Sequence, residues 1–181
     1  VCSSDLATMH REPVNLNELL TQVLELYEGQ ANGQGIKLVR EYEQELPFCM
    51  ADRKRLHRCF SNIASNGIQA MPEGGELEVS ARNVSLEEDN IWRLAAGSYL
   101  EITVADHGPG IVPENLHRIF DPYFTTKRGG TGLGLPIAKH IIEGLGGTIA
   151  VSSEPGHGTD VRIVLPFPHR TTDALTTRGL V

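Results

Sequence analysis

The chain has 181 residues, of which 40% are hydrophobic and 22% charged, and its formal net charge is −7. These values are ordinary for a globular domain, and they disfavour a disordered chain and a nucleic-acid-binding surface. No stretch approaches the roughly 20 apolar residues that span a bilayer, and the start lacks the pattern of a secretory signal. We therefore expect a cytoplasmic domain that makes no membrane contact itself, which leaves open a longer parent protein anchored in a membrane.

The cysteines and the chain ends give further expectations. Cys49 and Cys59 belong to no CxxC pair, so we expect small buried hydrophobic side chains in a reducing compartment. The first six residues, VCSSDL, match what a common sequencing-adapter string would encode in frame, and we hypothesise that 1–6 is an artefact. We expect 1–14 to be a residual upstream segment, 15–167 the folded domain and 168–181 a flexible polar tail.

Helices and strands alternate in the first part of the chain. The spacing of apolar residues predicts a helix that begins after Asn15 or Asn17 as its N-cap. Alternating apolar and polar residues predict a strand over 36–43. Asp52 is the expected N-cap of a second helix, which ends before Pro72.

Two alternating segments, 76–83 and 99–106, predict the next strands. The acidic connection between them, 84–98, is typical of a hairpin loop. A stretch with little periodicity follows over 107–131.

Helical spacing resumes over 135–145, and strands over 148–154 and 160–167 form a closing hairpin. The order is therefore α-β-α-β-β-α-β-β, in which neighbouring strands indicate a mixed or antiparallel sheet with helices on one face. We expect an α+β fold, a two-layer α/β sandwich. A doubly wound parallel fold would need regular βα alternation, which is absent.

The segment GGTGLGL (129–135) is a candidate phosphate site. It precedes a helix with Pro136 in its first turn, so glycine backbone and free helical N–H groups could face an anion. It is neither a P-loop, which needs a Gly-Lys pair, nor a dinucleotide fingerprint, which follows a strand directly. A flexible loop leading into a helix is the alternative.

Two further clusters carry candidate ligands. Asp106 in DHGPGI ends a strand and could accept a hydrogen bond from an adenine amino group, or it could simply initiate a turn. Asn62 and Asn66 in NIASNGIQA lie four residues apart on one helix face, where an amide oxygen could bind Mg²⁺. The alternative is a pair of partly exposed polar residues. The segment GHGT (156–159) has the composition of a turn.

The order and spacing of these clusters resemble the ATP-binding domain of the histidine kinase, gyrase, Hsp90 and MutL superfamily. NIASNGIQA resembles its N box, DHGPGI its first glycine box and FDPYFTTK (120–127) its F box, while GTGLGL and GHGT resemble its later glycine boxes. The resemblance covers about 15–167 and implies the Bergerat-type ATP-binding fold.

The resemblance also implies roles for individual residues. Asn66 matches the magnesium ligand, Asp106 the acceptor of the adenine amino group, and Lys127 a phosphate contact in the mobile lid. Asn62 and Lys127 occupy the positions implied to be catalytic. The remaining positions implied to bind the nucleotide are Gly108 and Gly110 by close approach, Gly132, Leu133 and Gly134 through backbone N–H groups, and Thr159 at the adenine, often through water.

Asn62 indicates which branch of the superfamily the chain resembles. ATPases of the superfamily carry a glutamate four residues before the magnesium asparagine as a general base, whereas Asn62 accepts no proton. The sequence therefore resembles the C-terminal ATP-binding catalytic domain of a sensor histidine kinase. Two alternatives stay open: a gyrase- or MutL-like ATPase, and a degenerate nucleotide-binding regulatory module.

This branch implies ATP and Mg²⁺ as cofactors and transfer of the γ-phosphate to a histidine in two-component signalling. The implied protein partners are the helical hairpin of the dimeric kinase that carries the phosphoacceptor histidine, and a response regulator receiver domain. His10 lacks the acidic residue and spaced proline that follow such a histidine, so we expect the chain to begin after the hairpin.

Overall fold

The computed structural model describes residues 10–167. The hypothesis about residues 1–6 and the expected tail at 168–181 concern residues outside this range. Within it, no helix is both long and apolar enough to cross a membrane.

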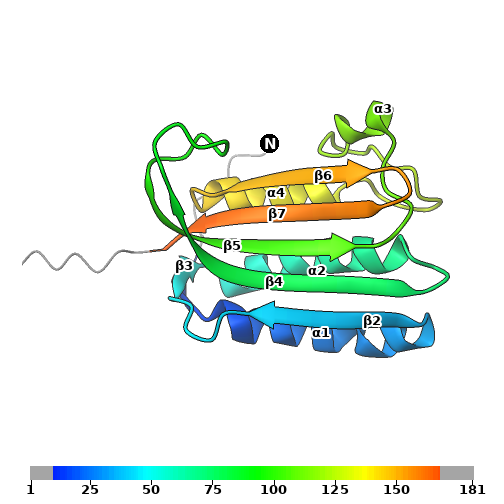
Figure 1. Cartoon of the computed structure of the whole chain (residues 1–181), viewed down its shortest axis with the longest axis horizontal. Helices are drawn as coiled ribbons and strands as arrows, with labels where there is room; N and C mark the ends of the chain where they lie inside the picture. The colour runs from blue at the N-terminus through cyan, green and yellow to red at the C-terminus, as the bar shows by residue number, and fades with distance from the viewer. Residues whose placement is uncertain (1–9, 168–181) are drawn as a thin grey trace, which may run out of the picture.

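Three helices form one layer of the molecule (Figure 1). They are α1 (Leu16–Gly33), α2 (Arg53–Gln69) and α4 (Gly134–Gly144), and α2 contacts both of the others. The first two begin at the caps that the sequence suggested. The Asn15 side chain accepts a hydrogen bond from the Glu18 N–H at 3.2 Å, and Asp52 accepts one from the Arg55 N–H at 3.1 Å. Such caps satisfy N–H groups that have no partner inside the helix.

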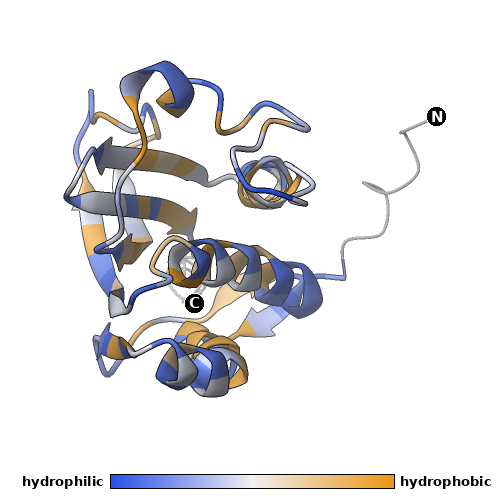
Figure 2. Cartoon of the chain, turned by 90° about the vertical axis from the view of Figure 1, so that its right-hand side faces the viewer, coloured by the Kyte–Doolittle hydropathy of each residue, from blue (hydrophilic) through white to orange (hydrophobic). Residues whose placement is uncertain are grey.

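Five strands form the second layer, in the order β2-β4-β5-β7-β6. Their bounds are β2 (Ile36–Tyr42), β4 (Gly75–Leu86), β5 (Gly97–Asp106), β6 (Thr148–Glu154) and β7 (Gly158–Pro166). The pair β2–β4 is parallel and the other pairs are antiparallel, so the sheet is mixed. The helices cover one face of this sheet (Figure 2). The expected α+β two-layer sandwich is confirmed.

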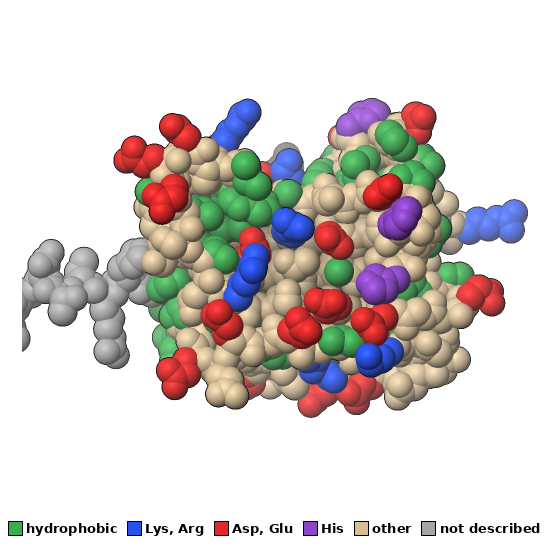
Figure 3. All heavy atoms as spheres, in the orientation of Figure 1, with side chains coloured by type: hydrophobic (Ala, Val, Ile, Leu, Met, Phe, Trp, Pro, Cys, Tyr) green, Lys and Arg blue, Asp and Glu red, His purple; other side chains and the backbone are tan. Residues whose placement is uncertain are grey.

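Charged side chains lie over the sheet face opposite the helices (Figure 3). On β4, Leu77, Val79 and Ala81 are buried in the core, while the residues between them are partly exposed. This alternation is the usual pattern of a sheet with one solvated face. The core includes Phe60 of α2, which is 1% exposed.

The structure contains elements that the periodicity did not predict. Strands β1 (Glu12–Val14) and β3 (Cys49–Ala51) form a separate antiparallel pair, and α3 (Pro113–Leu116) is a single turn in the stretch expected to be irregular. Elements of three or four residues are too short to show a period. The strand β1 pairs with β3 just before residue 15, where we expect the domain to begin.

The hairpin between β4 and β5 is also longer than expected. Val84 pairs with Tyr99 and Leu86 with Gly97, so the connection covers 87–96 instead of 84–98.

The two cysteines inside the described range behave as small buried side chains, as expected. Burial raises the pKa of Cys49 to about 11 and that of Cys59 to about 12, so both thiols stay protonated at neutral pH.

Candidate functional site

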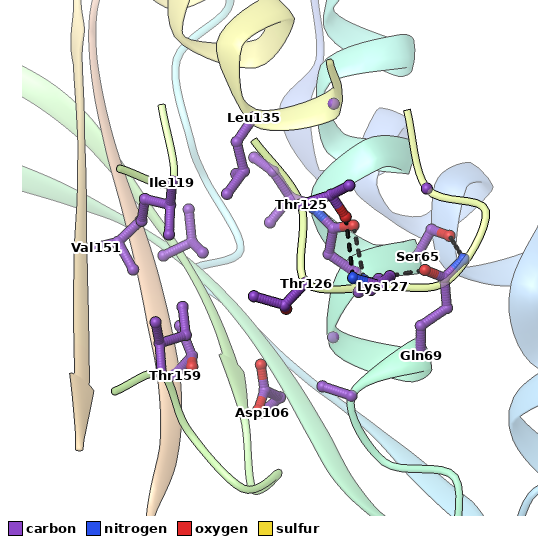
Figure 4. A pocket seen from close by; sticks show the side chains of 18 of the residues that line it. Ser65, Gln69, Asp106, Ile119, Thr125, Thr126, Lys127, Leu135, Val151 and Thr159 are labelled. Carbon is purple, nitrogen blue, oxygen red and sulfur yellow. Dashed lines mark hydrogen bonds between the residues drawn. The ribbon is translucent and has the colours of Figure 1, made fainter. Parts of the chain in front are cut away.

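A pocket of about 760 Å³ lies where α2, the end of β5, the start of β7 and the segment before α4 meet (Figure 4). This volume is in the range of small-molecule sites. Of the ten residues assigned to the site from the sequence, all but Gly108 and Leu133 line it. The eight lining residues are Asn62, Asn66, Asp106, Gly110, Lys127, Gly132, Gly134 and Thr159.

Asp106 is the buried carboxylate of the pocket, with 9% of its surface exposed. Burial raises its pKa, backbone N–H groups of Gly108 and Thr159 lower it, and the nearby Asp160 raises it. The Gly108 N–H donates to Asp106 Oδ1 at 2.9 Å. Asp106 therefore does initiate a turn, and the same side chain also faces the pocket.

Glycines on this side of the pocket are required by packing within the protein. A Cβ on Gly158, whose φ is +108°, would lie 1.9 Å from the Asp106 carbonyl oxygen. A Cβ on Gly110 would lie 2.2 Å from the Glu154 carbonyl oxygen. No real side chain tolerates such distances. Gly110 also lines the pocket, so its expected role in close approach of a ligand stays a prediction, and the structure adds a second reason for glycine: contact between two loops of the protein.

Ser153 lies on the same side of the pocket as Asp106, which we call the wall, and the sequence analysis missed it. Its hydroxyl accepts from the Ile111 N–H at 2.8 Å and donates to the Gly158 carbonyl at 2.9 Å. Because a hydroxyl has only one proton, Thr159 must donate to Ser153 across their 2.8 Å contact. Ser153 thus joins the end of β6 to the start of β7 and to the loop after β5. It also leaves the Thr159 oxygen free to accept a hydrogen bond in the pocket.

Apolar side chains form another part of the lining, and this part was not predicted either. They come from the end of the first glycine box and the segment after it, from the first turn of α4 and from β6 and β7 (Figure 4). They are Ile111, Val112, Ile119, Leu135, Val151 and Val161. Such surfaces suit the face of a flat aromatic ring.

Helix α2 supplies the polar wall opposite. Asn62 Nδ2 donates to the Gly134 carbonyl at 3.4 Å, so it contacts the first residue of α4. Asn66 Oδ1 accepts from Lys127 Nζ at 3.1 Å, and Gln69, another unpredicted residue, accepts from the same ammonium at 2.9 Å. Partial burial lowers the pKa of Lys127, and the Asp106 carboxylate raises it.

The segment from the end of the F box to the start of α4 lines the pocket, and we call residues 125–133 the lid. The Tyr123 N–H donates to the Gly132 carbonyl at 2.9 Å, and a Cβ on Gly132 would lie 2.4 Å from the Tyr123 carbonyl carbon. Arg118 stacks over the Phe124 ring at 4.4 Å from its centroid. Leu133 caps α4, so its N–H and those that follow lie at the start of a helix.

No group of three His, Cys, Asp or Glu side chains within residues 10–167 is placed to hold a metal ion. Amide oxygens such as that of Asn66 line the pocket, and Mg²⁺ sites on phosphates commonly combine few protein oxygens with oxygens of the ligand.

Known proteins of one family share this architecture. A family model described as histidine kinase-, DNA gyrase B- and HSP90-like ATPase matches residues 51–169. The sensor histidine kinase ZraS of Escherichia coli (strain K12) is 37% identical over 155 residues, which cover 86% of this chain and 31% of ZraS. The chain thus spans about a third of that relative's length.

Two solved structures agree with this match. Full-length ShkA in complex with AMPPNP gives a TM-score of 0.74 at 30% identity, covering 90% of this chain and 32% of ShkA. The catalytic domain of the histidine kinase ThkA gives a TM-score of 0.72 at 31% identity, covering 88% of this chain and 97% of that domain. The chain therefore belongs to the family of histidine kinase-, DNA gyrase B- and HSP90-like ATPases, and within that family it matches sensor histidine kinases and their catalytic domains.

Proposed function

We propose that this domain binds Mg–ATP and transfers the γ-phosphate to a histidine on the helical hairpin of a dimeric sensor kinase. One observation carries the proposal most directly. Asn66, Asp106 and Lys127, which lie far apart in the sequence, line one pocket with Asn62 one helical turn before Asn66. An amide at that position cannot take a proton from water, so transfer to an imidazole is favoured over hydrolysis.

The adenine lies against the apolar lining and donates its amino hydrogen to Asp106. The Thr159 oxygen accepts a further hydrogen bond, directly or through water, because its own proton goes to Ser153. Gly108 supports this end by donating its N–H to the Asp106 carboxylate. Gly110 supports it by allowing its loop to pack against Glu154.

The phosphates lie toward the start of α4, where Gly132, Leu133 and Gly134 offer backbone N–H groups. Lys127 contributes a positive charge from the lid. These groups position the phosphoryl chain and stabilise negative charge, which is most of what phosphoryl transfer requires of a protein.

The residues present also fit Mg²⁺. The Asn66 amide oxygen already accepts a hydrogen bond from the Lys127 ammonium, so this oxygen is oriented to contact a cation. When bound, the metal would supply positive charge that neutralises the phosphates. Asn66 is the protein ligand that we assign to it.

The partners that we propose are the phosphoacceptor hairpin of the parent kinase and a response regulator receiver domain that takes the phosphoryl group from the histidine. ATP titration, followed by incubation with an added phosphoacceptor hairpin, tests the proposal. We expect Mg-dependent binding, slow hydrolysis alone and phosphorylation of the hairpin. Fast steady hydrolysis without a hairpin would favour a gyrase- or MutL-like ATPase, and no binding at millimolar ATP would refute both.

A further inference from the structure

The lysine of the lid binds two oxygens on one face of α2 (Figure 4). Lys127 Nζ donates to Asn66 Oδ1 at 3.1 Å and to Gln69 Oε1 at 2.9 Å. Asn66 and Gln69 are three residues apart in a helix, so their side chains project from the same side. The end of α2 thus offers two amide oxygens to one cation.

Hydrogen-bond donors fix the orientation of the Gln69 amide. An ammonium only donates, so the amide oxygen must face Lys127. The Gln69 nitrogen then donates to Ser65 Oγ at 3.2 Å, one turn earlier on α2. In the hydrogen bonds that link Ser65, Gln69 and Lys127, each donor therefore faces an acceptor.

A tight turn presents Lys127 to this pair. Thr125 Oγ1 accepts from the Lys127 N–H at 3.1 Å, and the Lys127 carbonyl accepts from the Gly130 N–H at 3.2 Å. Gly129 has a φ of +73° and no heavy atom within 4 Å of an added Cβ, so the tip of the turn faces open space. The Lys127 side chain therefore ties an otherwise projecting turn to α2.

The Lys127 ammonium and the proposed Mg²⁺ would then both bind the same oxygen, Asn66 Oδ1. Asn66 Oδ1 holds the Lys127 ammonium, and it is also the atom that we assign to Mg²⁺. A dication on this oxygen would lie beside a like charge, which is unfavourable at such short range. Gln69, in contrast, contacts the lysine without any metal role assigned to it.

We infer that Asn66 and Gln69 form a latch for Lys127, and that Mg-nucleotide binding displaces the lysine from Asn66 and frees it for the terminal phosphate. This inference rests on the proposed nucleotide function. Gln69 is a positioning residue in this scheme: it holds the lid on α2 until the metal binds. The latch couples metal binding to rearrangement of the lid, because Asn66 Oδ1 cannot bind the metal and the Lys127 ammonium at the same time without charge repulsion.

The test uses Gln69→Leu with Mg–ADP, a probe that lacks the γ-phosphate that Lys127 would contact. Loss of the Gln69 contact weakens the hold of α2 on Lys127, which competes with the metal for Asn66. Mg–ADP should therefore bind roughly fivefold more tightly, the effect of one partly exposed charged contact. The gain should vanish when Mg²⁺ is chelated. Lys127→Met removes both contacts of the ammonium and should gain at least as much. The double variant should gain no more than Lys127→Met alone, because without the ammonium Gln69 has no lysine to hold. Gln30→Leu, an exposed glutamine on α1, is the matched control and should change nothing.

A second measurement needs no nucleotide. Amide hydrogen exchange over residues 125–133 should be faster in Gln69→Leu than in the unaltered chain and in Gln30→Leu. Unchanged exchange, or ADP affinity that stays the same or falls in Gln69→Leu, would overturn the latch. Failure of the unaltered chain to bind Mg–ADP would refute the proposed function and the displacement together, while the exchange would still report whether the contact exists.

Discussion

The two sides of the pocket are built in different ways. On the sheet side, Asp106 and Thr159 are cross-strand partners, and their loops pack so closely that a Cβ on Gly158 would overlap a carbonyl oxygen. On the lid side, the turn around Gly129 extends into open space and is tied to α2 through the Lys127 side chain. The side of the pocket beside Asp106 is made of backbone contacts and is preformed. The tip of the lid is tied to α2 only through the Lys127 side chain, so it can move at small cost.

The largest effect is expected where the wall is tightest. Gly158→Ala should lower the free energy of unfolding by more than about 3 kcal/mol, because the new Cβ meets Asp106 backbone that cannot move aside. Gly156→Ala is the matched control, since its φ is also positive at +85° but nothing lies within 4 Å of its Cβ. It should cost about 1 kcal/mol. Chemical denaturation measures both, and equal losses would show that the wall is not rigid.

The next largest effect is expected at Asp106, where a substitution should change ATP affinity without lowering stability. Asp106→Asn should weaken ATP binding about 10- to 100-fold, the value of a hydrogen bond to a charged group. The melting temperature should not fall, because burial already disfavours the charge in the folded state. Calorimetric titration and thermal melts measure the two quantities.

The pH dependence of this variant has a definite sign. The folded-state pKa of Asp106 is raised above its ordinary 3.8, so the stability that this group contributes is present at low pH and lost as the pH rises through the raised value. The amide that replaces the carboxyl group in the variant does not titrate. The stability of Asp106→Asn relative to the unaltered chain should therefore be highest at neutral pH and decline on acidification; a trend in the opposite direction would contradict the burial argument.

In the lid, a steric clash at Gly132 should weaken nucleotide binding and leave the stability of the fold nearly unchanged. A Cβ on Gly132 would meet the Tyr123 backbone at 2.4 Å, but the lid can shift away from it. Gly132→Ala should therefore weaken Mg–ATP binding by about 1–3 kcal/mol while changing the melting temperature little. Gly129→Ala, with a similar φ and open space, should weaken binding less. A large loss of stability in Gly132→Ala would mean that the lid is as rigid as the wall.

The smallest effect is expected at the base of the pocket. A Cβ on Gly67 would meet Leu77 Cδ1 at 2.6 Å, and this atom is the end of a flexible side chain that can turn away. Alanine also gains about 1 kcal/mol of helix propensity over glycine in α2. Gly67→Ala should therefore change the free energy of unfolding by less than about 1 kcal/mol, as denaturant titration would show.

The same contrast explains which features the sequence could predict. Helix caps such as Asn15 and Asp52 follow from local chemistry, and the order of elements predicted the layers of the fold. Asn66, Asp106 and Lys127 were found through motif order, and the structure places them around one pocket. Their roles toward ATP and Mg²⁺ remain proposals.

Ser153 was missed because its role depends on the register of β6 and β7, which places it opposite Thr159. No local pattern encodes that register. Gln69 could have been found, since it lies one turn after Asn66 on the predicted helix face. Glycines were the hardest to interpret, because the sequence does not show that a glycine such as Gly110, which lines the pocket, is also required for contact with another loop of the protein.

The most direct test of the proposed function follows the γ-phosphate itself. Labelled ATP is incubated with Mg²⁺, this chain and a phosphoacceptor hairpin, and the label is divided between hairpin and free phosphate. We expect acid-labile, alkali-stable label on the hairpin, as for phosphohistidine, with little free phosphate and no label in Asn66→Ala. Label released mainly as free phosphate at the same rate with or without the hairpin would contradict the account.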